Sequence, residues 1–328
     1  MSGDVCPSCG EALSDGQCPA CRDTRAETPN RSRKLREREV TQVSALAVGE
    51  LLEERWRLTG VLRRGPLSTV YVADDLQTKA PAVVKSLSAA LTRDTDAVQR
   101  FNRECQLLRE LEHPHLVPLL GSGWRGVTPW VAMPRLEGHT LTDELDAGRL
   151  PHDRVLGVVR QLGAALQFLH DRGLVHRDVK PGNVFVGAGG HVTLLDLGLA
   201  HDALGPLLTR PGQKLGTVAY MAPEQIDGAP VDGRTDVYAL GVVTFELLCG
   251  ELPFDGREHE VLRAHQVAAP PSLTALEPRV PAGLSAAVQR AMAKAPADRF
   301  ATVDDFVARV QLFLELPATA PVEPLRRR

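Results

Sequence analysis

The sequence contains no run of eighteen or more apolar residues, so it offers no candidate for a membrane-spanning helix. It also carries little net charge. Its 38 Lys and Arg residues nearly balance 41 Asp and Glu residues, and nothing in this composition favours nucleic acid or an anionic membrane as the main partner. The N-terminus lacks the charged start and apolar core of an export signal. These absences predict a soluble, unexported, cytoplasmic protein.

The chain also lacks the spread of cysteines that a disulfide framework needs. Four of the six cysteines lie close to the start: Cys6, Cys9, Cys18 and Cys21. The other two, Cys105 and Cys249, stand singly in apolar helical contexts. In a reducing compartment, closely paired cysteines are more often metal ligands or redox groups than disulfides.

The four N-terminal cysteines follow the pattern C-x2-C-x8-C-x2-C, with glycine or proline beside each pair. Four thiolates suit tetrahedral Zn²⁺, and so short a segment has too small a core to fold without a metal. A redox pair is the competing interpretation, but it normally needs one CxxC at a helix start within a βαβ unit, which is missing here. The pattern therefore predicts a zinc ribbon over residues 1–24 with an interaction or regulatory role.

Beyond this segment, residues 25–50 are predicted to form a polar, charged linker. Short β-rich runs separated by turn residues then predict strands over 56–62, 69–73, 82–87, 116–120 and 130–133. Helical spacing of apolar residues predicts helices around Phe101–Leu111 and over 155–169, 237–249, 284–293 and 303–314, and residues 317–328 form a tail. The fold class is α+β, with strands preceding helices.

Two motifs carry the chemistry: LVHRDVKPGN at residues 174–183 and LLDLGLA at residues 194–200. In phosphoryl transfer, the aspartate of an H-R-D-x-x-x-x-N loop accepts the substrate hydroxyl proton, its asparagine binds Mg²⁺, and a later Asp-x-Gly supplies a second metal ligand. Asp178, Asn183 and Asp196 fit this spacing, and their oxygens suit a hard cation. A simple turn is the competing interpretation of DVKPGN, but the apolar runs that flank both motifs favour catalysis.

With these motifs in this order, residues 51–316 resemble the protein kinase family, and most closely the bacterial Ser/Thr kinases of eukaryotic type. The resemblance implies a two-lobed protein kinase-like fold, with a β-rich N-lobe at 51–133, a hinge at 134–138 and a helical C-lobe at 139–316. It implies ATP and Mg²⁺ as cofactors and protein Ser and Thr hydroxyls as acceptors. Autophosphorylation within a homodimer is a further expectation from the family.

The resemblance also implies roles for individual residues. Lys85, at the end of the run AVVK, would pair with Glu104 and contact the α- and β-phosphates. Asp178 would act as the base, Lys180 would neutralise charge on the transferred phosphoryl group, and Thr217 would help to orient Asp178 and the substrate. An isolated Lys–Glu pair is more often a solvated surface pair, but the order of the motifs favours the functional interpretation.

Other residues would support the catalytic loop and its regulation. Glu224 of the Ala-Pro-Glu segment would form a buried ion pair with Arg299, and Asp236 would anchor the catalytic-loop backbone. Arg177 beside the catalytic aspartate commonly needs an activation-loop phosphate in this family, and Thr209 is the favoured acceptor, with Thr217 second. An ordinary loop threonine remains the alternative for Thr209.

By the same resemblance, ATP would contact residues of the N-lobe, the hinge and one C-lobe strand: Leu62, Gly65, Val70, Val83, Lys85, Pro134, Leu136 and Phe185. Pro134 keeps its carbonyl and Leu136 its amide, so adenine recognition is retained. The glycine-rich loop departs from the family pattern, because Arg63 and Ser68 replace its first and third glycines.

That departure leaves a pseudokinase, a nucleotide-binding scaffold, as the alternative to an active kinase. The set Lys85, Asp178, Asn183 and Asp196 favours the enzyme. A kinase acting on a small molecule is a third interpretation, and the Ala-Pro-Glu segment, which resembles a platform for protein substrates, argues against it.

Overall fold

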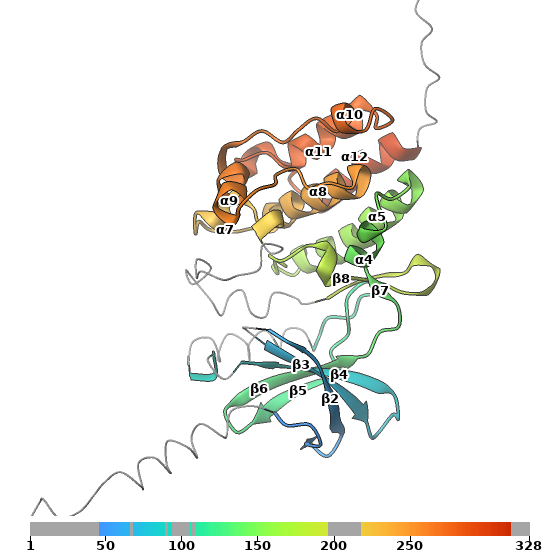
Figure 1. Ribbon diagram of the computed structural model, residues 1–328, viewed down its shortest axis with the longest axis vertical. Coiled ribbons are helices and arrows are strands. Elements are labelled where there is room, and N and C mark those ends of the chain that lie inside the picture. Colours follow the sequence, from blue (N-terminus) through green and yellow to red (C-terminus); the bar gives the residue numbers. More distant parts are fainter. Residues whose placement is uncertain are drawn as a thin grey trace, which may run out of the picture. The chain divides into compact units, whose positions relative to one another are not determined.

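The computed structural model describes residues 46–65, 68–88, 91–93, 105, 109–195 and 218–315, except for the side chains of residues 93 and 315 (Figure 1). The chain divides after Ala45 into two units, and all described residues belong to the second. Several predictions lie outside the described residues: the zinc ribbon with its four cysteines, Glu104, Asp196, Thr209, Thr217 and most of the helix around Phe101–Leu111. The described fold begins at Leu46, within the predicted linker, and the Leu46 carbonyl accepts a hydrogen bond from the buried Tyr71 hydroxyl (2.7 Å).

The N-lobe is a six-stranded antiparallel sheet in the order β1-β2-β3-β4-β6-β5. Its strands are β1 (Leu51–Leu52), β2 (Trp56–Arg64), β3 (Ser68–Asp75), β4 (Pro81–Leu87), β5 (Gly121–Arg125) and β6 (Thr128–Pro134). One face of the sheet buries a core in which the Trp56 and Trp130 rings meet edge to face, with centroids 5.1 Å apart. The strands β2, β3, β4 and β6 confirm the predicted ones.

The prediction of a strand at residues 116–120 is wrong, because the strand beside β6 is β5, which starts at Gly121. Glycine has a low strand propensity, so the run GSGWR gives a weak signal in the sequence. The structure nevertheless requires glycine there: a Cβ added at Gly121 would lie 2.2 Å from the Trp56 ring. Packing against a ring from a distant strand therefore outweighs local propensity.

The C-lobe consists of helices and a small antiparallel sheet in the order β7-β8-β9 (Figure 1). Its strands are β7 (His139–Thr140), β8 (Val184–Val186) and β9 (Val192–Leu194). Its described α-helices are α4 (Leu141–Asp146), α5 (His152–His170), α7 (Pro223–Ile226), α8 (Gly233–Cys249), α9 (Glu258–Val267), α10 (Leu273–Leu276), α11 (Ala282–Ala291) and α12 (Val303–Glu315). Its short 3-10 helices are η3 (Pro181–Asn183), η4 (Ala188–Gly190), η6 (Val218–Tyr220) and η7 (Pro296–Asp298), and a further one, η2 (Leu91–Arg93), belongs to the N-lobe. Helices α5, α8, α11 and α12 confirm predicted helices, whereas α4, α7, α9 and α10 are not among the predicted ones.

Helix α8 is the centre of the C-lobe core, and most of its residues are buried against α5, α11 and α12. The helix begins where the Asp232 side chain accepts a hydrogen bond from the Arg234 amide (2.8 Å). It ends at Gly250, whose φ of 83° lies in the left-handed region that glycine tolerates. This packing holds Asp236, in the first turn of α8, in a fixed position for the catalytic loop.

The two lobes are connected by backbone contacts on either side of the hinge. The Leu194 amide donates to the His115 carbonyl (2.9 Å), and the Val117 amide donates to the Leu194 carbonyl (3.1 Å). At the end of the hinge, Gly138 has a φ of 141°, and a Cβ there would lie 2.0 Å from the Val186 carbonyl oxygen. Only glycine allows the hinge to approach β8 this closely.

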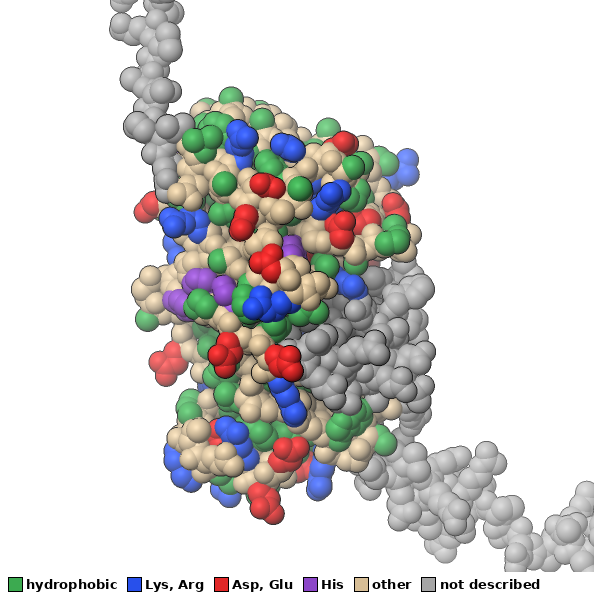
Figure 2. Space-filling model, turned by 180° about the vertical axis from the view of Figure 1, so that it is seen from behind, with side chains coloured by type: hydrophobic (Ala, Val, Ile, Leu, Met, Phe, Trp, Pro, Cys, Tyr) green, Lys and Arg blue, Asp and Glu red, His purple; other side chains and the backbone are tan. Residues whose placement is uncertain are grey.

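The described surface carries charge of both signs. Acidic and basic side chains are interspersed over the face shown in Figure 2. None of the described helices is long and apolar enough to cross a membrane. Recognition on the face in view is therefore expected to depend on local groups more than on a large field of one sign.

Candidate active site

The catalytic loop runs from the end of α5 to η3, and Asp236 of α8 anchors it. One carboxylate oxygen of Asp236 accepts from the His176 amide and the other from the Arg177 amide, each at 2.8 Å. His170 Nε2 lies 2.7 Å from the first of these oxygens. Asp236 is completely buried, so these hydrogen bonds stabilise its charge in place of water. The predicted anchoring role of Asp236 is confirmed.

Asp178 lies at the centre of a compact group of polar side chains. Lys180 Nζ donates to both carboxylate oxygens of Asp178, at 2.8 and 2.7 Å. The Asn183 Nδ2 group donates to the Asp178 carboxylate and to its main-chain carbonyl, both at 2.8 Å. Asn183 is buried on η3, so its Oδ1 is the oxygen left for a cation. Three residues that the sequence singled out are thus in direct contact.

The strand that leads to Asp196 is tied to this same group, although Asp196 itself lies outside the described residues. The Leu195 amide donates to the Asn183 carbonyl at 2.7 Å. The Leu195 carbonyl lies 3.0 Å from His176 Nε2. Because both backbone groups of Leu195 are held, the residue immediately before Asp196 is fixed next to Asn183. The sequence analysis assigned no role to His176, whose ring is buried.

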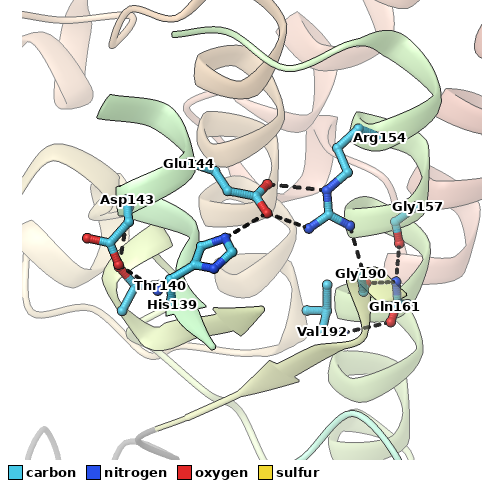
Figure 3. A network of polar contacts seen from close by, with 9 residues as sticks. All are labelled: His139, Thr140, Asp143, Glu144, Arg154, Gly157, Gln161, Gly190 and Val192. Atoms are coloured by element: carbon cyan, nitrogen blue, oxygen red, sulfur yellow. Dashed lines mark hydrogen bonds and ion pairs between the residues drawn. The ribbon is translucent and has the colours of Figure 1, made fainter. Parts of the chain in front are cut away.

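A polar network also fixes the turn between β8 and β9, as Figure 3 shows. Gln161 on α5 accepts from the Val192 amide (2.8 Å) and donates to the Gly190 carbonyl (3.2 Å). Arg154 donates to the same carbonyl (3.2 Å) and to both oxygens of Glu144 (2.8 and 3.2 Å). Burial alone would raise the pKa of Glu144, but hydrogen bonds from Arg154 and from His139 of β7 outweigh it and lower the pKa.

Lys85 lies on β4 with 9% of its surface exposed. Its direct cross-strand partners are Val70 on β3 and Val131 on β6. A lysine this buried needs an opposite charge nearby, and its predicted partner Glu104 lies outside the described residues. The position of Lys85 on an apolar strand agrees with the strand predicted over residues 82–87.

Two of the predicted nucleotide residues, Val70 and Val83, share the face of Lys85. Val70 is opposite Lys85 in the register, and Val83 is two residues from Lys85 on β4 and opposite Met133. Val70 and Val83 are partly buried, whereas their neighbours Tyr71 and Val84 point into the N-lobe core. This face is therefore the one available to an apolar ring.

The remaining predicted nucleotide residues lie around this face in different elements. Pro134 ends β6 opposite Ala82, Leu136 follows in the hinge, and Phe185 is on β8. Gly65 directly follows β2, and its amide donates to the Ser68 carbonyl (2.8 Å) at the start of β3. Leu62 is 56% exposed on β2.

The predicted ion pair of Glu224 and Arg299 is confirmed. Two guanidinium nitrogens donate to the two carboxylate oxygens, each at 2.7 Å, and Thr235 adds a third donor to Glu224 at 2.7 Å. Burial alone would raise the pKa of Glu224, but the hydrogen bonds of Arg299 outweigh it and lower the pKa. The pair fixes the start of α7 beside α8.

Two residues of this region were not predicted from the sequence. Gln225, on α7, donates to the Arg177 carbonyl at 2.9 Å. His265, on α9, is completely buried and lies 2.8 Å from the Tyr238 hydroxyl. A glutamine three positions after a helix cap is a known capping signal and could have pointed to Gln225. No comparable sequence signal marks His265.

Comparison with known proteins identifies relatives of this chain. The protein kinase domain family matches residues 56–302. The Bacillus subtilis serine/threonine-protein kinase PrkC is 31% identical over 268 residues, which cover 81% of this chain and 41% of PrkC. PknE of Mycobacterium bovis is 35% identical over 254 residues, covering 77% of this chain and 45% of PknE. The chain thus spans less than half the length of these curated relatives.

Solved structures agree with the sequence relatives. The crystal structure of the Mycobacterium tuberculosis PknI kinase domain has a TM-score of 0.68 and 31% sequence identity, and the match covers 83% of this chain and 100% of that one. The two-lobed architecture predicted from the sequence is confirmed by this likeness. Since the family match spans most of the chain and the HRD loop is built as described above, the chain belongs to the protein kinase family.

Proposed function

We propose that this chain is an ATP-dependent Ser/Thr protein kinase that transfers the γ-phosphoryl group of ATP to protein hydroxyls. The observation that carries the proposal is the grouping of Asp178, Lys180 and Asn183 within direct hydrogen-bonding distance on an anchored loop. A lysine two residues after the catalytic aspartate is typical of Ser/Thr kinases. The names of the relatives support the same activity.

The chemistry follows from the positions of these groups. A bound Mg²⁺ would neutralise phosphate charge, and Asn183 Oδ1 together with Asp196 would hold it. Asp178 accepts the proton of the attacking hydroxyl and orients its oxygen toward the γ-phosphorus. Lys180, now paired with Asp178, is placed to stabilise negative charge on the transferred group. Lys85 would hold the α- and β-phosphates, and Thr217 would help to orient Asp178 and the acceptor.

The proposal is tested by incubating the purified chain with radiolabelled ATP, Mg²⁺ and a generic protein acceptor. Asp178→Asn keeps the size of the side chain but removes the base, so transfer should fall by about 10²- to 10⁴-fold. Asp146→Asn, at the exposed end of α4, is the matched control and should behave as the wild type. Transfer that persists in Asp178→Asn would refute the proposed role. A folded wild-type protein that binds ATP without transfer would point to a pseudokinase.

Phosphosite mapping in the same experiment examines regulation. We propose that Thr209 is the autophosphorylation site and that two copies of the chain meet during the reaction, because the family commonly compensates the arginine of HRD with an activation-loop phosphate. Label should then appear on Thr209 at a rate that rises with enzyme concentration. Label on Thr217 alone, or a rate per molecule independent of concentration, would contradict this.

We also propose that residues 1–24 form a zinc ribbon through Cys6, Cys9, Cys18 and Cys21 and that the protein acts in the cytoplasm, where thiolates stay reduced. The support is the spacing of the two CxxC pairs. Metal analysis of the full chain should find one zinc per molecule, and Cys6→Ser with Cys18→Ser should lose it. Cys249→Ser is the matched control. A metal content unchanged by the double substitution would refute the site.

A further inference from the structure

Arg177, the residue immediately before Asp178, has an unusual backbone conformation. Its φ is 67°, in the left-handed region that residues with a Cβ seldom adopt. A strained residue persists only where the surrounding structure holds it in place. The direction in which the Asp178 carboxylate points therefore depends on whatever holds the Arg177 peptide groups.

Two different helices hold these groups, one on each side of the residue. The Arg177 amide donates to Asp236 at the start of α8 (2.8 Å). The Arg177 carbonyl accepts from the side-chain amide of Gln225 on α7 (2.9 Å). The bond to Gln225 spans 48 positions of the sequence. The left-handed conformation is thus clamped from α7 as well as from α8.

The other end of the Gln225 side chain contacts the segment that precedes α7. Gln225 Oε1 accepts from the Ala222 amide at 3.0 Å. Ala222 occupies the N-cap position but has no polar side chain, so the contact from Gln225 to the N-cap amide is the one side-chain contact of a capping box that the described residues make at this helix. The backbone next to Gln225 is itself fixed, because Glu224 is locked to Arg299. One planar amide therefore connects the catalytic loop to the start of the Ala-Pro-Glu segment.

We propose that Gln225 is a positioning residue for phosphoryl transfer. Its amide nitrogen holds the carbonyl of Arg177, and its oxygen contacts Ala222 at the end of the segment Val218–Ala222. The Asp178 carboxylate is thereby kept in a fixed position relative to that segment. This inference rests on the proposed kinase activity and adds a determinant of the rate of transfer. The hydrogen bond is comparable in strength to the cost of a left-handed residue, so its loss lets the loop relax away from the productive geometry.

Substitutions can separate the role of the Gln225 side-chain nitrogen from that of its oxygen. Gln225→Glu keeps an oxygen acceptor for the Ala222 amide but places a second oxygen against the Arg177 carbonyl. Gln225→Met removes both contacts. Gln289→Met is the matched control, because Gln289 on α11 also directs its amide nitrogen at a backbone carbonyl, that of Pro270 (3.4 Å), away from the catalytic loop. The three variants distinguish a cap on α7 from a clamp on the loop.

Steady-state kinetics and thermal unfolding give the first readout. We expect kcat to fall roughly tenfold in Gln225→Met and by at least as much in Gln225→Glu, with the KM for ATP unchanged. Gln225→Glu should keep the wild-type melting temperature, because the cap is retained. Wild-type kcat in Gln225→Glu, or a loss of kcat that follows only the melting temperature, would overturn the proposal.

Hydrogen exchange gives a second readout that does not need activity. A peptide covering residues 174–183 should exchange faster in both Gln225 variants than in the wild type, while peptides from α5 stay unchanged. The control variant should match the wild type in both regions. Unchanged exchange in the loop overturns the clamp, whereas faster exchange in a protein without kinase activity would reject the proposed function and keep the clamp.

Discussion

Replacing Arg299 with methionine should lower the free energy of unfolding by about 3–5 kcal/mol, the usual result of removing one member of a buried ion pair. The Arg299 side chain is 0% exposed and makes both hydrogen bonds of its bidentate pair with Glu224 at 2.7 Å. Its other donors reach three main-chain carbonyls, those of Arg234, Ala293 and Lys294, at 2.9, 2.8 and 3.0 Å. After the substitution, the described partner left to the Glu224 carboxylate is the Thr235 hydroxyl.

The magnitude follows from the charge that is left behind. Hydrogen bonds from Arg299 lower the pKa of Glu224 in the native protein against the effect of burial. Without Arg299, burial dominates and raises that pKa above its unfolded value. A carboxyl with a raised folded pKa favours the folded state when it is protonated, so the deficit of the variant should shrink as the pH falls toward 4. The double variant Glu224→Leu with Arg299→Met should be less destabilised than Arg299→Met alone.

Urea unfolding at 25 °C, followed by circular dichroism at pH 7 and pH 5, measures these differences. Arg257→Met is the matched control, because its pair with Glu260 has side chains 76% and 45% exposed. Loss of such an exposed pair should change the free energy of unfolding far less than loss of the buried pair does. A loss of less than about 1 kcal/mol in Arg299→Met, or a double variant as unstable as the sum of its singles, would refute the reasoning.

Two further predictions concern stability. Burial, with the nearby charge of Lys294, lowers the pKa of His265 to about 4, below the unfolded value of 6.5, so the unfolded chain binds more protons between these values. The free energy of unfolding should therefore fall by roughly 3 kcal/mol more in the wild type than in His265→Gln as the pH drops from 7 to 4. Urea unfolding at several pH values measures this, and an equal dependence on pH in the two proteins would contradict it. Gly121→Ala should unfold at least 5 °C below the wild type in a thermal melt because its Cβ would lie 2.2 Å from the Trp56 ring; Gly60→Ala, with no heavy atom within 4 Å of the added Cβ, is the control.

Strong periodic patterns were sufficient to predict the long elements. Helix α5 carries apolar residues at helical spacing along one face, and the predicted range 155–169 lies within its observed bounds. The glycine-rich strand β5 was missed, because its glycines are required by close packing against tryptophan rings of other strands and not favoured by strand propensity. Short helices such as α4 were missed because fewer than two turns show no clear period.

The residues around Asp178 were likewise only partly predictable from the sequence. Asp178, Lys180 and Asn183 lie within six positions, so the spacing of one motif already places them together. The motif alone does not reveal the left-handed Arg177, whose amide and carbonyl form hydrogen bonds with two distant helices. The resemblance to protein kinases supplied the distant pair of Glu224 and Arg299 but not the link made by Gln225.

The sequence by itself determined the order of the lobes, the candidate catalytic groups and their spacing along one loop, because these depend on neighbours along the chain. The tertiary structure decided how that loop is held. His176, Arg177 and Leu195 receive hydrogen bonds or contacts from residues 19 to 60 positions away. Such contacts depend on how helices and strands pack, and hydrophobic periodicity, which specifies which face is buried, carries no information about which buried polar groups will meet.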